Sequence, residues 1–489
     1  MIQIDGLSME QFESALNSGK LPFIKQLLNH SNYLLHSFYS GLPSSTPAVQ
    51  AELFYGVKGA VPAFGFFCRS SGIIGNMLSS QFARTVQSRI EKRGYNLLKG
   101  GSAYSDILTG GARKALFCAT SLGFEVICGK RRIVGLLKIV LRPFLLLRVL
   151  SLLLLEFFLA VMDFFRGLLQ HQRFINEIIF IPSRVAICIL LRELIVLGVC
   201  HDIVEGYPII HCNFLGYDEQ SHRRGPKSVF AHWTLKGIDG AIRRIICSSR
   251  RGNCRHYKFL IYSDHGQEEV KSYADEFGVS LKEALTNVLD KKISVDQKDS
   301  DIGIQKRRAL LLGVRQFRNF DVVEPQRRKG HIIISSVGPL AHLYFEGPLN
   351  EKCKRNIAET LVNRAHIPSV LFSDHNSDVY VMTKENCWRL KENASEFLGR
   401  DHPFSCEITQ DLIDLVHHPD AGDLICCGWR KLAKPLSFPQ ENGAHAGPGP
   451  QETHGFVIIP ADFLGKDSKE IYYVRPLWLR KAVMKFLNG

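Results

Sequence analysis

The sequence predicts an α/β fold in which short buried strands carry polar residues to one edge of a sheet. The apolar segment 1–4 ends at Asp5, and the strand-like segment 256–262 is followed closely by Asp264. Ligands of open α/β sheets bind at the carboxyl ends of the strands, where both aspartates are expected. A chain of 489 residues with 45% hydrophobic residues can form one large α/β domain with insertions or two to three smaller domains. We expect a single catalytic domain over residues 1–489.

Four short segments contain residue types that suit a two-metal phosphoryl-transfer site. They are Asp5-Gly6, Ser44-Ser45-Thr46-Pro47, Asp218-x-x-x-His222 and Ser263-Asp264-His265-Gly266. Cleavage of a phosphoester requires charge stabilisation on the attacking and the leaving oxygen at once, which two cations about 4 Å apart provide. Carboxylates and neutral imidazoles are natural ligands for such cations.

The spacing within two of these segments indicates how each pair is presented. Asp218 and His222 are four residues apart, so on a helix both side chains lie on one side and can share an ion. Asp264 and His265 are adjacent, which suits a strand end that opens into a loop. Alone, the first pair also fits a solvated helix face and the second an ordinary polar loop. The order of the segments, each with its strand or turn, favours the metal site.

Together these motifs resemble the alkaline phosphatase superfamily, most closely its type I phosphodiesterase and nucleotide pyrophosphatase branch. The matching segments are Gln3–Leu7, Pro43–Gln50, Gly216–Pro226 and Tyr262–Gln267. The resemblance implies an alkaline-phosphatase-like three-layer α/β/α sandwich with a mostly parallel central sheet. It also implies two divalent metal ions, with Zn²⁺ as the expected metal.

The resemblance further implies two sets of metal ligands. Asp5, Thr46, Asp264 and His265 would surround one ion, and Asp218, His222 and a C-terminal histidine would surround the other.

We expect the C-terminal ligand to be His445, which lies in a turn before the apolar segment 455–460. The turn resembles the Gly-x-His-Gly turn of the family, but Ala446 replaces its last glycine. His454 is therefore retained as an alternative.

Thr46 is the expected nucleophile, because it occupies the position that matches the nucleophile of the family. A threonine hydroxyl needs a metal or a base to become reactive, and the resemblance implies a phosphothreonine intermediate. Ser44 and Ser45 are the neighbouring alternatives, and the segment could instead serve only as a helix cap. Arg223 and Arg224 could neutralise a second anionic group of the substrate or could form a solvated basic turn.

The expected function is a metal-dependent phosphodiesterase or pyrophosphatase acting on a nucleotide or a lipid-linked phosphodiester. A phosphomonoesterase and a phosphoethanolamine transferase use the same core and stay as alternatives, as does a catalytically silent membrane-surface protein. A sulfatase is disfavoured, because Thr46-Pro47-Ala48 lacks the Cys/Ser-x-Pro-x-Arg pattern.

Residues 131–200 form a hydrophobic insertion that predicts an amphipathic helical hairpin. Its first half is interrupted by charges that fall within roughly 120° of a helical projection, and this leaves a broad apolar face. The longest charge-free stretch there, 149–155, is far shorter than the ~20 residues of a spanning helix. We expect the face to contact a membrane surface, with internal packing and an oligomer interface as alternatives. The charged residues are Lys138, Arg142, Arg148, Glu156, Asp163 and Arg166.

The composition favours anionic partners without choosing among them. Lysine and arginine exceed aspartate and glutamate by 61 − 47 = 14. The basic clusters lack aromatic residues arranged to stack bases, so no specific nucleic-acid binding is expected. The resemblance to the alkaline phosphatase superfamily implies that residues 275–440 contain a substrate-covering insertion. Thirteen cysteines, an odd number, and the lack of a signal peptide favour the cytoplasmic side of a membrane.

Overall fold

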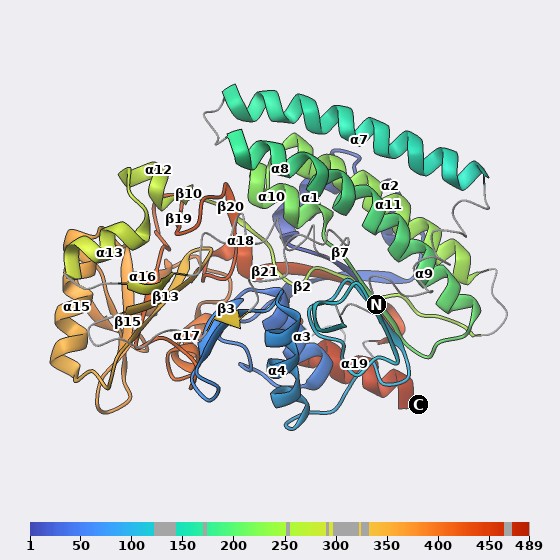
Figure 1. The fold of residues 1–489 in the computed structure, drawn as a ribbon. Helices are drawn as coiled ribbons and strands as arrows, with labels where there is room; N and C mark the ends of the chain where they lie inside the picture. Colours follow the sequence, from blue (N-terminus) through green and yellow to red (C-terminus); the bar gives the residue numbers. More distant parts are fainter. Residues whose placement is uncertain are drawn as a thin grey trace.

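The computed structural model shows an α/β architecture in which helices cover both faces of a central sheet (Figure 1). The structure describes residues 1–121, 143–169, 174–250, 255–289, 293–296, 322–323, 332–463 and 472–488. Parts of the predicted segments 131–200 and 275–440 therefore lie outside the described residues, including Lys138 and Arg142.

The central sheet has seven strands in the order β2-β21-β8-β1-β7-β5-β6. The pairings from β8 through β6 are parallel, whereas β21 runs antiparallel to both of its neighbours. The predicted α/β fold with a mostly parallel central sheet is confirmed. The strands are β1 (Ile2–Ile4), β2 (Tyr33–Tyr39), β5 (Ser102–Tyr104), β6 (Lys114–Leu116), β7 (Ile210–Phe214), β8 (Ile261–Tyr262) and β21 (His454–Pro460).

Alternation of apolar side chains along the strands explains why both faces of the sheet are covered. In β21, Val457 and Ile459 join one buried cluster, while Phe456 and Ile458 join the other. The first cluster is completed by helices α3 (Thr46–Tyr55), α4 (Ser80–Glu91) and α19 (Pro476–Asn488). The second is completed by α1 (Met9–Asn17), α2 (Pro22–His30), α9 (Arg192–Val204) and α11 (Val229–Ser249). In Figure 1 these two sets of helices lie below and above the sheet.

A second seven-stranded sheet lies beside the first, in the order β11-β13-β14-β18-β15-β16-β17. Its strands fall within residues 275–440, and its hairpin between β13 and β14 reaches the site described below. These strands are β11 (Ile293–Asp296), β13 (Ile332–Val337), β14 (Leu340–Phe345), β15 (Ser369–Ser373), β16 (Val379–Met382), β17 (Cys387–Arg389) and β18 (Leu424–Cys427). Helices α13 (Leu281–Leu289), α15 (Glu351–Arg364), α16 (Ala394–Leu398) and α17 (Ser405–Val416) accompany them.

Short elements connect the two sheets. A three-stranded sheet contains β3 (Gly65–Cys68), β4 (Ile73–Asn76) and β12 (Val322–Val323). Two-stranded pairs form between β9 (Glu268–Glu269) and β20 (Gly443–Ala444), and between β10 (Lys271–Ser272) and β19 (Leu436–Ser437). These short strands contact helices α10 (Gly216–Arg224), α12 (Tyr273–Phe277) and α18 (Pro450–Thr453).

The hydrophobic insertion forms helix α7 (Pro143–Leu169), which lies along α8 (Phe174–Val185) at the top of Figure 1. A π-helical turn, Ala186–Leu191, joins α8 to α9. None of the described helices is long and apolar enough to cross a membrane.

The charged side of α7 faces the protein. Arg184 of α8 is fully buried and pairs with Glu156 at 2.6 Å and with Asp163 at 3.0 Å. The apolar side of α7 faces outward. The described residues of the core do not cover this surface.

We predict that Arg184→Met strongly destabilises the protein, because it leaves the buried Glu156 carboxylate without its cation. The expected loss is about 3–5 kcal/mol in the free energy of unfolding, measured by urea denaturation. Lys258→Met is the matched control, since Lys258 and its partner Asp462 are both about half exposed. It should cost no more than about 1 kcal/mol. Equal, small losses in both variants would contradict the importance of the buried pair.

Candidate active site and metal centre

The predicted ligands come together at the carboxyl ends of three parallel strands. Asp5 follows β1, Asp264 follows β8 after one residue, and α10, which carries Asp218 and His222, begins just after β7. Five of these ligands, which are Asp5, Thr46, Asp218, His222 and His445, border a narrow cavity of about 40 Å³ whose lining does not include Asp264 or His265. Its polar lining includes Asp5, Thr46, Asn213, Asp218, His222, Glu441 and His445, and its apolar lining includes Phe64, Leu78, Ile107, Phe117 and Val337.

One group of ligand atoms surrounds His265 next to the proposed nucleophile. Asp5, Asp264 and His265 can each place a ligand atom within 4.8 Å of the others. His265 Nε2 lies 3.4 Å from Asp264 Oδ2 and 3.3 Å from Thr46 Oγ1. The structure therefore gathers the four residues that the resemblance assigns to one ion.

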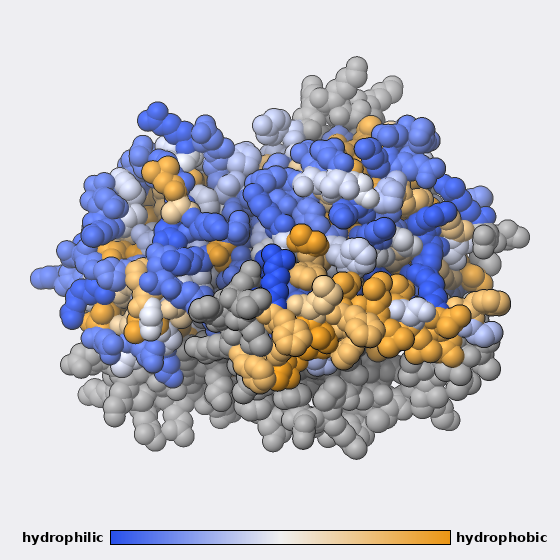
Figure 2. Space-filling model, turned by 90° about the horizontal axis from the view of Figure 1, so that it is seen from above, coloured by the Kyte–Doolittle hydropathy of each residue, from blue (hydrophilic) through white to orange (hydrophobic). Residues whose placement is uncertain are grey.

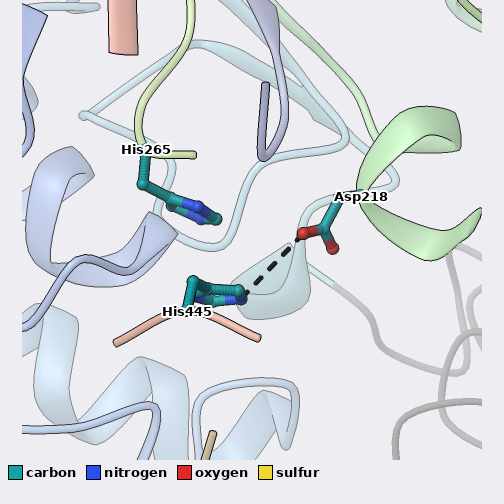
Figure 3. A group of neighbouring side chains, drawn as sticks. All are labelled: Asp218, His265 and His445. Atoms are coloured by element: carbon teal, nitrogen blue, oxygen red, sulfur yellow. Dashed lines mark ion pairs between the residues drawn. The ribbon is translucent and has the colours of Figure 1, made fainter. Parts of the chain in front are cut away.

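A second group contains Asp218, His265 and His445 (Figure 3). His445 Nε2 lies 4.0 Å from Asp218 Oδ1, and His222 Nε2 lies 3.4 Å from the same oxygen. The rings of His265 and His445 are stacked with their centroids 4.0 Å apart. His265 is thus within reach of both groups, although the resemblance assigns it to one ion only.

Hydrogen bonds orient all three imidazoles in the same way. The Nδ1 atoms of His265 and His445 lie 2.9 Å from the Gly266 carbonyl and 2.8 Å from the Ser44 carbonyl. Carbonyl oxygens only accept, so each Nδ1 carries the proton and donates it. His222 Nδ1 likewise faces Glu441 Oε2 at 2.8 Å. His265 and His445 are thus left with the Nε2 lone pair directed away from the anchoring carbonyl, the arrangement typical of histidine metal ligands, and His222 is anchored through the same nitrogen.

The electrostatics of the cavity fit divalent cations. Asp264 is fully buried, and neither of its carboxylate oxygens has a hydrogen-bond partner in the described structure. Burial raises the pKa of Asp264, since the charged form is poorly stabilised there. A buried, ionised carboxylate requires a compensating positive charge, and no lysine or arginine is among the described residues that line the cavity.

The histidine pKa values follow from burial and from the neighbouring carboxylates. Burial, reinforced by His265 and His222, holds the pKa of His445 well below its usual range, which keeps the ring neutral. Burial also lowers the pKa of His222, but Asp218 and Glu441 outweigh it and raise that pKa well above the usual range. This excess negative charge around His222 is what a bound cation would neutralise.

Thr46 is the first residue of α3 and is nearly buried, with its hydroxyl at the cavity. Ser45 precedes it in an extended conformation, but the Ser45 side chain makes no capping hydrogen bond and its Oγ has no partner. The Ser44 hydroxyl instead bonds to the Gly447 carbonyl and accepts from the Ala446 amide. The three hydroxyls therefore have different surroundings, and only that of Thr46 lies against a proposed ligand.

Gly6 lets the end of β1 approach α10. Its φ is +71°, and a Cβ atom there would lie 2.6 Å from Asp218 Oδ1. A side chain at this position would displace the Asp218 carboxylate, so the Asp5-Gly6 pair is required for the two groups of ligands to be adjacent.

Three further residues hold the ligands in place and were not predicted from the sequence. Asn213, at the end of β7, donates to Asp5 Oδ2 at 2.6 Å. Gln267 donates to Asp218 Oδ1 at 2.5 Å, and Glu441 bonds to His222. Two of them could have been suspected from their positions in the sequence, because Gln267 follows the SDHG motif and Glu441 lies in the same turn as His445.

The structure places Arg223 and Arg224 outside the cavity lining. Both pair with Glu177 of α8, and Arg224 also bonds to Asp163 Oδ1 of α7 at 2.8 Å. The two arginines therefore form neither a solvated turn nor a free anion-binding pair. Their charges are neutralised by carboxylates of α7 and α8, where these helices pack near α10.

His454 also lies apart from the ligand groups. Its Nε2 faces the Ser37 hydroxyl at 3.0 Å across the β2–β21 pair. His445 is thus the C-terminal histidine whose ring faces Asp218.

Comparison with known proteins gives matches only among solved structures; no family model and no curated protein matches the chain. Phosphonoacetate hydrolase from Sinorhizobium meliloti 1021, in complex with phosphonoformate, has 12% sequence identity and a TM-score of 0.48. The match covers 99% of this chain and 94% of that one. Murine ectonucleotide pyrophosphatase/phosphodiesterase 5 has 9% identity and a TM-score of 0.47, with 100% and 94% covered. Similarity of this degree says nothing about the reaction, which must be inferred from the residues of this chain.

We predict that His445→Ala lowers the metal content of the protein while His454→Ala leaves it unchanged. After zinc loading and dialysis, the wild type and His454→Ala should retain about two ions per chain, and His445→Ala about one. Inductively coupled plasma mass spectrometry measures this directly. The reverse pattern would make His454 the ligand.

We predict that Ala446→Gly stabilises the protein, because Ala446 has a φ of +95°, a conformation that favours glycine. The expected gain is up to about 1 kcal/mol, seen as a higher Tm in thermal unfolding. Ala444→Gly in strand β20 is the matched control and should lower stability by about 0.5–1 kcal/mol. A lower Tm for Ala446→Gly would show that the alanine is not strained.

Proposed function

We propose that this protein is a phosphoester hydrolase that uses two divalent cations and the Thr46 hydroxyl as its nucleophile. The observation that carries the proposal is the orientation of three imidazoles, each anchored through Nδ1, with Nε2 within 4.0 Å of one or more of the buried carboxylates Asp5, Asp218 and Asp264. Asp5, Thr46, Asp264 and His265 would hold one ion, and Asp218, His222 and His445 the other. Nitrogen and carboxylate donors fit Zn²⁺. When bound, the ions would stabilise the charges on the attacking and leaving oxygens.

In the first step, Thr46 Oγ1 attacks phosphorus, and the bond from phosphorus to the leaving-group oxygen breaks. The Thr46 proton passes to solvent, and the departing oxygen takes up a proton from solvent. Thr46 stands at the first turn of α3, where the helix dipole favours a negatively charged phosphoryl group; Pro47 has no amide hydrogen, and the Ala48 amide donates to the Ser45 carbonyl. Asn213 holds Asp5, and Gln267 holds Asp218, so the ligand carboxylates need little reorganisation during the reaction.

In the second step, water attacks the phosphothreonine, the bond between phosphorus and Oγ1 breaks, and Thr46 regains its proton. Two in-line displacements leave the configuration at phosphorus unchanged. The neutral His445 ring, held by the Ser44 carbonyl, keeps the turn of residues 445–447 next to the nucleophile throughout.

The cavity favours a phosphodiester over a phosphomonoester. A monoester dianion brings one more negative charge than a diester into a space already lined by carboxylates, and no described lysine or arginine lines it. The apolar side chains Phe64 and Phe117 offer a surface for the organic part of a substrate. Both a nucleotide and a lipid head group meet these requirements.

The proposed hydrolase acts at the cytoplasmic surface of a membrane. The outward apolar face of α7 supports contact with lipid. The eleven cysteines in the described ranges are all free thiols, which fits a reducing compartment.

We predict that Thr46→Ala abolishes zinc-dependent hydrolysis of bis-p-nitrophenyl phosphate, with a loss of about 10³-fold or more in kcat. Ser45→Ala is the matched control and should keep wild-type turnover, because the Ser45 hydroxyl forms no hydrogen bond in the described structure. Both variants are assayed with zinc and with chelator, beside the monoester p-nitrophenyl phosphate. Diester turnover that survives in Thr46→Ala would exclude Thr46 as nucleophile. A metal-loaded wild type that hydrolyses neither ester would contradict the reaction itself.

A further inference from the structure

Helix α7 exposes a continuous apolar face. Nine large apolar side chains of this helix are between 46% and 88% exposed, and their spacing of three to four residues places most of them on one side. Figure 2 shows apolar side chains gathered in one band on this side of the molecule. The nine are Phe144, Leu147, Leu150, Leu154, Leu155, Phe157, Phe158, Met162 and Phe165. A patch of this length is unusual for a protein surface that contacts only water.

The opposite side of α7 is held in place by buried ion pairs. Glu156 and Asp163 are the acidic residues of this helix, and both are at most 3% exposed. Arg184 of α8 and Arg224 of α10 bind them. The helix is thus anchored by its charged side, and rotation that would bury the apolar face would break this network.

The polar groups exposed on α7 are basic or already satisfied. Arg166 is exposed, whereas Arg148, with 43% of its side chain exposed, lies 3.6 Å from the buried Glu193 carboxylate of α9. The Ser151 hydroxyl donates to the Leu147 carbonyl at 2.8 Å and so needs no water. In the sequence, the thirty residues from 126 to 155 contain six basic residues and no acidic residue.

We infer that α7 is an interfacial helix that seats the protein on an anionic lipid bilayer. The apolar side chains enter the boundary between head groups and acyl chains, while arginines at the edge of the face reach lipid phosphates. The excess of lysine and arginine over aspartate and glutamate in the whole sequence adds attraction to an anionic leaflet.

The charge pattern favours lipid over a second copy of the chain. In a symmetric dimer the same face of each copy meets, and the exposed Arg166 side chains of both copies would gain no carboxylate from α7, because Glu156 and Asp163 are buried in pairs with Arg184 and Arg224. An anionic bilayer supplies both the apolar phase and the negative charge that the face requires.

The geometry also connects this surface to the active site. Arg223 and Arg224 directly follow the proposed ligand His222 on α10, and their pairs with Glu177 and Asp163 attach α10 to α8 and α7. The bilayer would therefore lie against the helices that pack on a ligand-bearing helix. This makes a lipid-borne phosphodiester the favoured substrate class, a consequence that rests on the proposed hydrolase.

The test is flotation of the full chain with vesicles of phosphatidylcholine, with and without phosphatidylserine. The wild type should float with the mixed vesicles, and binding should weaken with salt and without phosphatidylserine. The double variant Leu154→Gln/Phe158→Gln should bind about ten-fold or more weakly. Leu432→Gln is the matched control, since Leu432 is 94% exposed but lies far along the chain in a loop. It should bind as the wild type does.

Catalysis is measured separately, so that the two proposals can fail independently. Leu154→Gln/Phe158→Gln should hydrolyse soluble bis-p-nitrophenyl phosphate at the wild-type rate, which shows that the fold is intact. Thr46→Ala should still float. A wild type that does not bind vesicles, or a double variant that binds normally, would overturn the inference. So would a wild-type dimer that dissociates in the double variant without any vesicle binding, because the face would then serve self-association.

Discussion

The site depends on the concentration of buried negative charge at the carboxyl ends of β1, β7 and β8. Asp5, Asp218 and Asp264 are each at most 2% exposed, and His265 shares a group of ligand atoms with each of them. No basic side chain among the described lining residues offsets them. Three neutral-capable imidazoles, each oriented through Nδ1, are arranged around the same space. Bound cations would compensate this charge, and this connects the fold to the proposed chemistry.

A second group of buried carboxylates is compensated by arginines of the protein rather than by proposed cations. Between α7, α8 and α10, the carboxylates Glu156, Asp163 and Glu177 are matched by Arg184, Arg223 and Arg224 within the protein itself. This network is internally neutral and needs no ligand. It holds the hydrophobic helices on the catalytic core with their apolar side outward. Helix α10 contributes to both groups. His222 belongs to the group at the site, and the next two residues, Arg223 and Arg224, belong to the ion-pair network.

The structure agrees best with predictions that rest on neighbouring residues in the sequence. The Asp218–His222 spacing predicts a helical turn, and both residues lie in α10. The segment after Ser45 predicts a helix, and α3 begins at Thr46. The strand expected over 256–262 is shorter, because only Ile261 and Tyr262 pair with β1 and β21. The contributions of Asn213 and Glu441 could not be predicted, since each depends on contact with a residue more than two hundred positions away.

The sequence by itself determined which residue types stand at the strand ends, because an apolar strand followed by aspartate or by DxxxH is a local pattern. It also determined that α7 is amphipathic, since helical periodicity is a property of consecutive residues. Only the tertiary structure decided which histidine joins the site, because His445 and His454 differ in what the fold places opposite them. It likewise decided that Arg223 and Arg224 bind Glu177 rather than line the cavity, and that the charged side of α7 turns inward. Long-range pairing of buried charges sets these outcomes, and no local pattern encodes it.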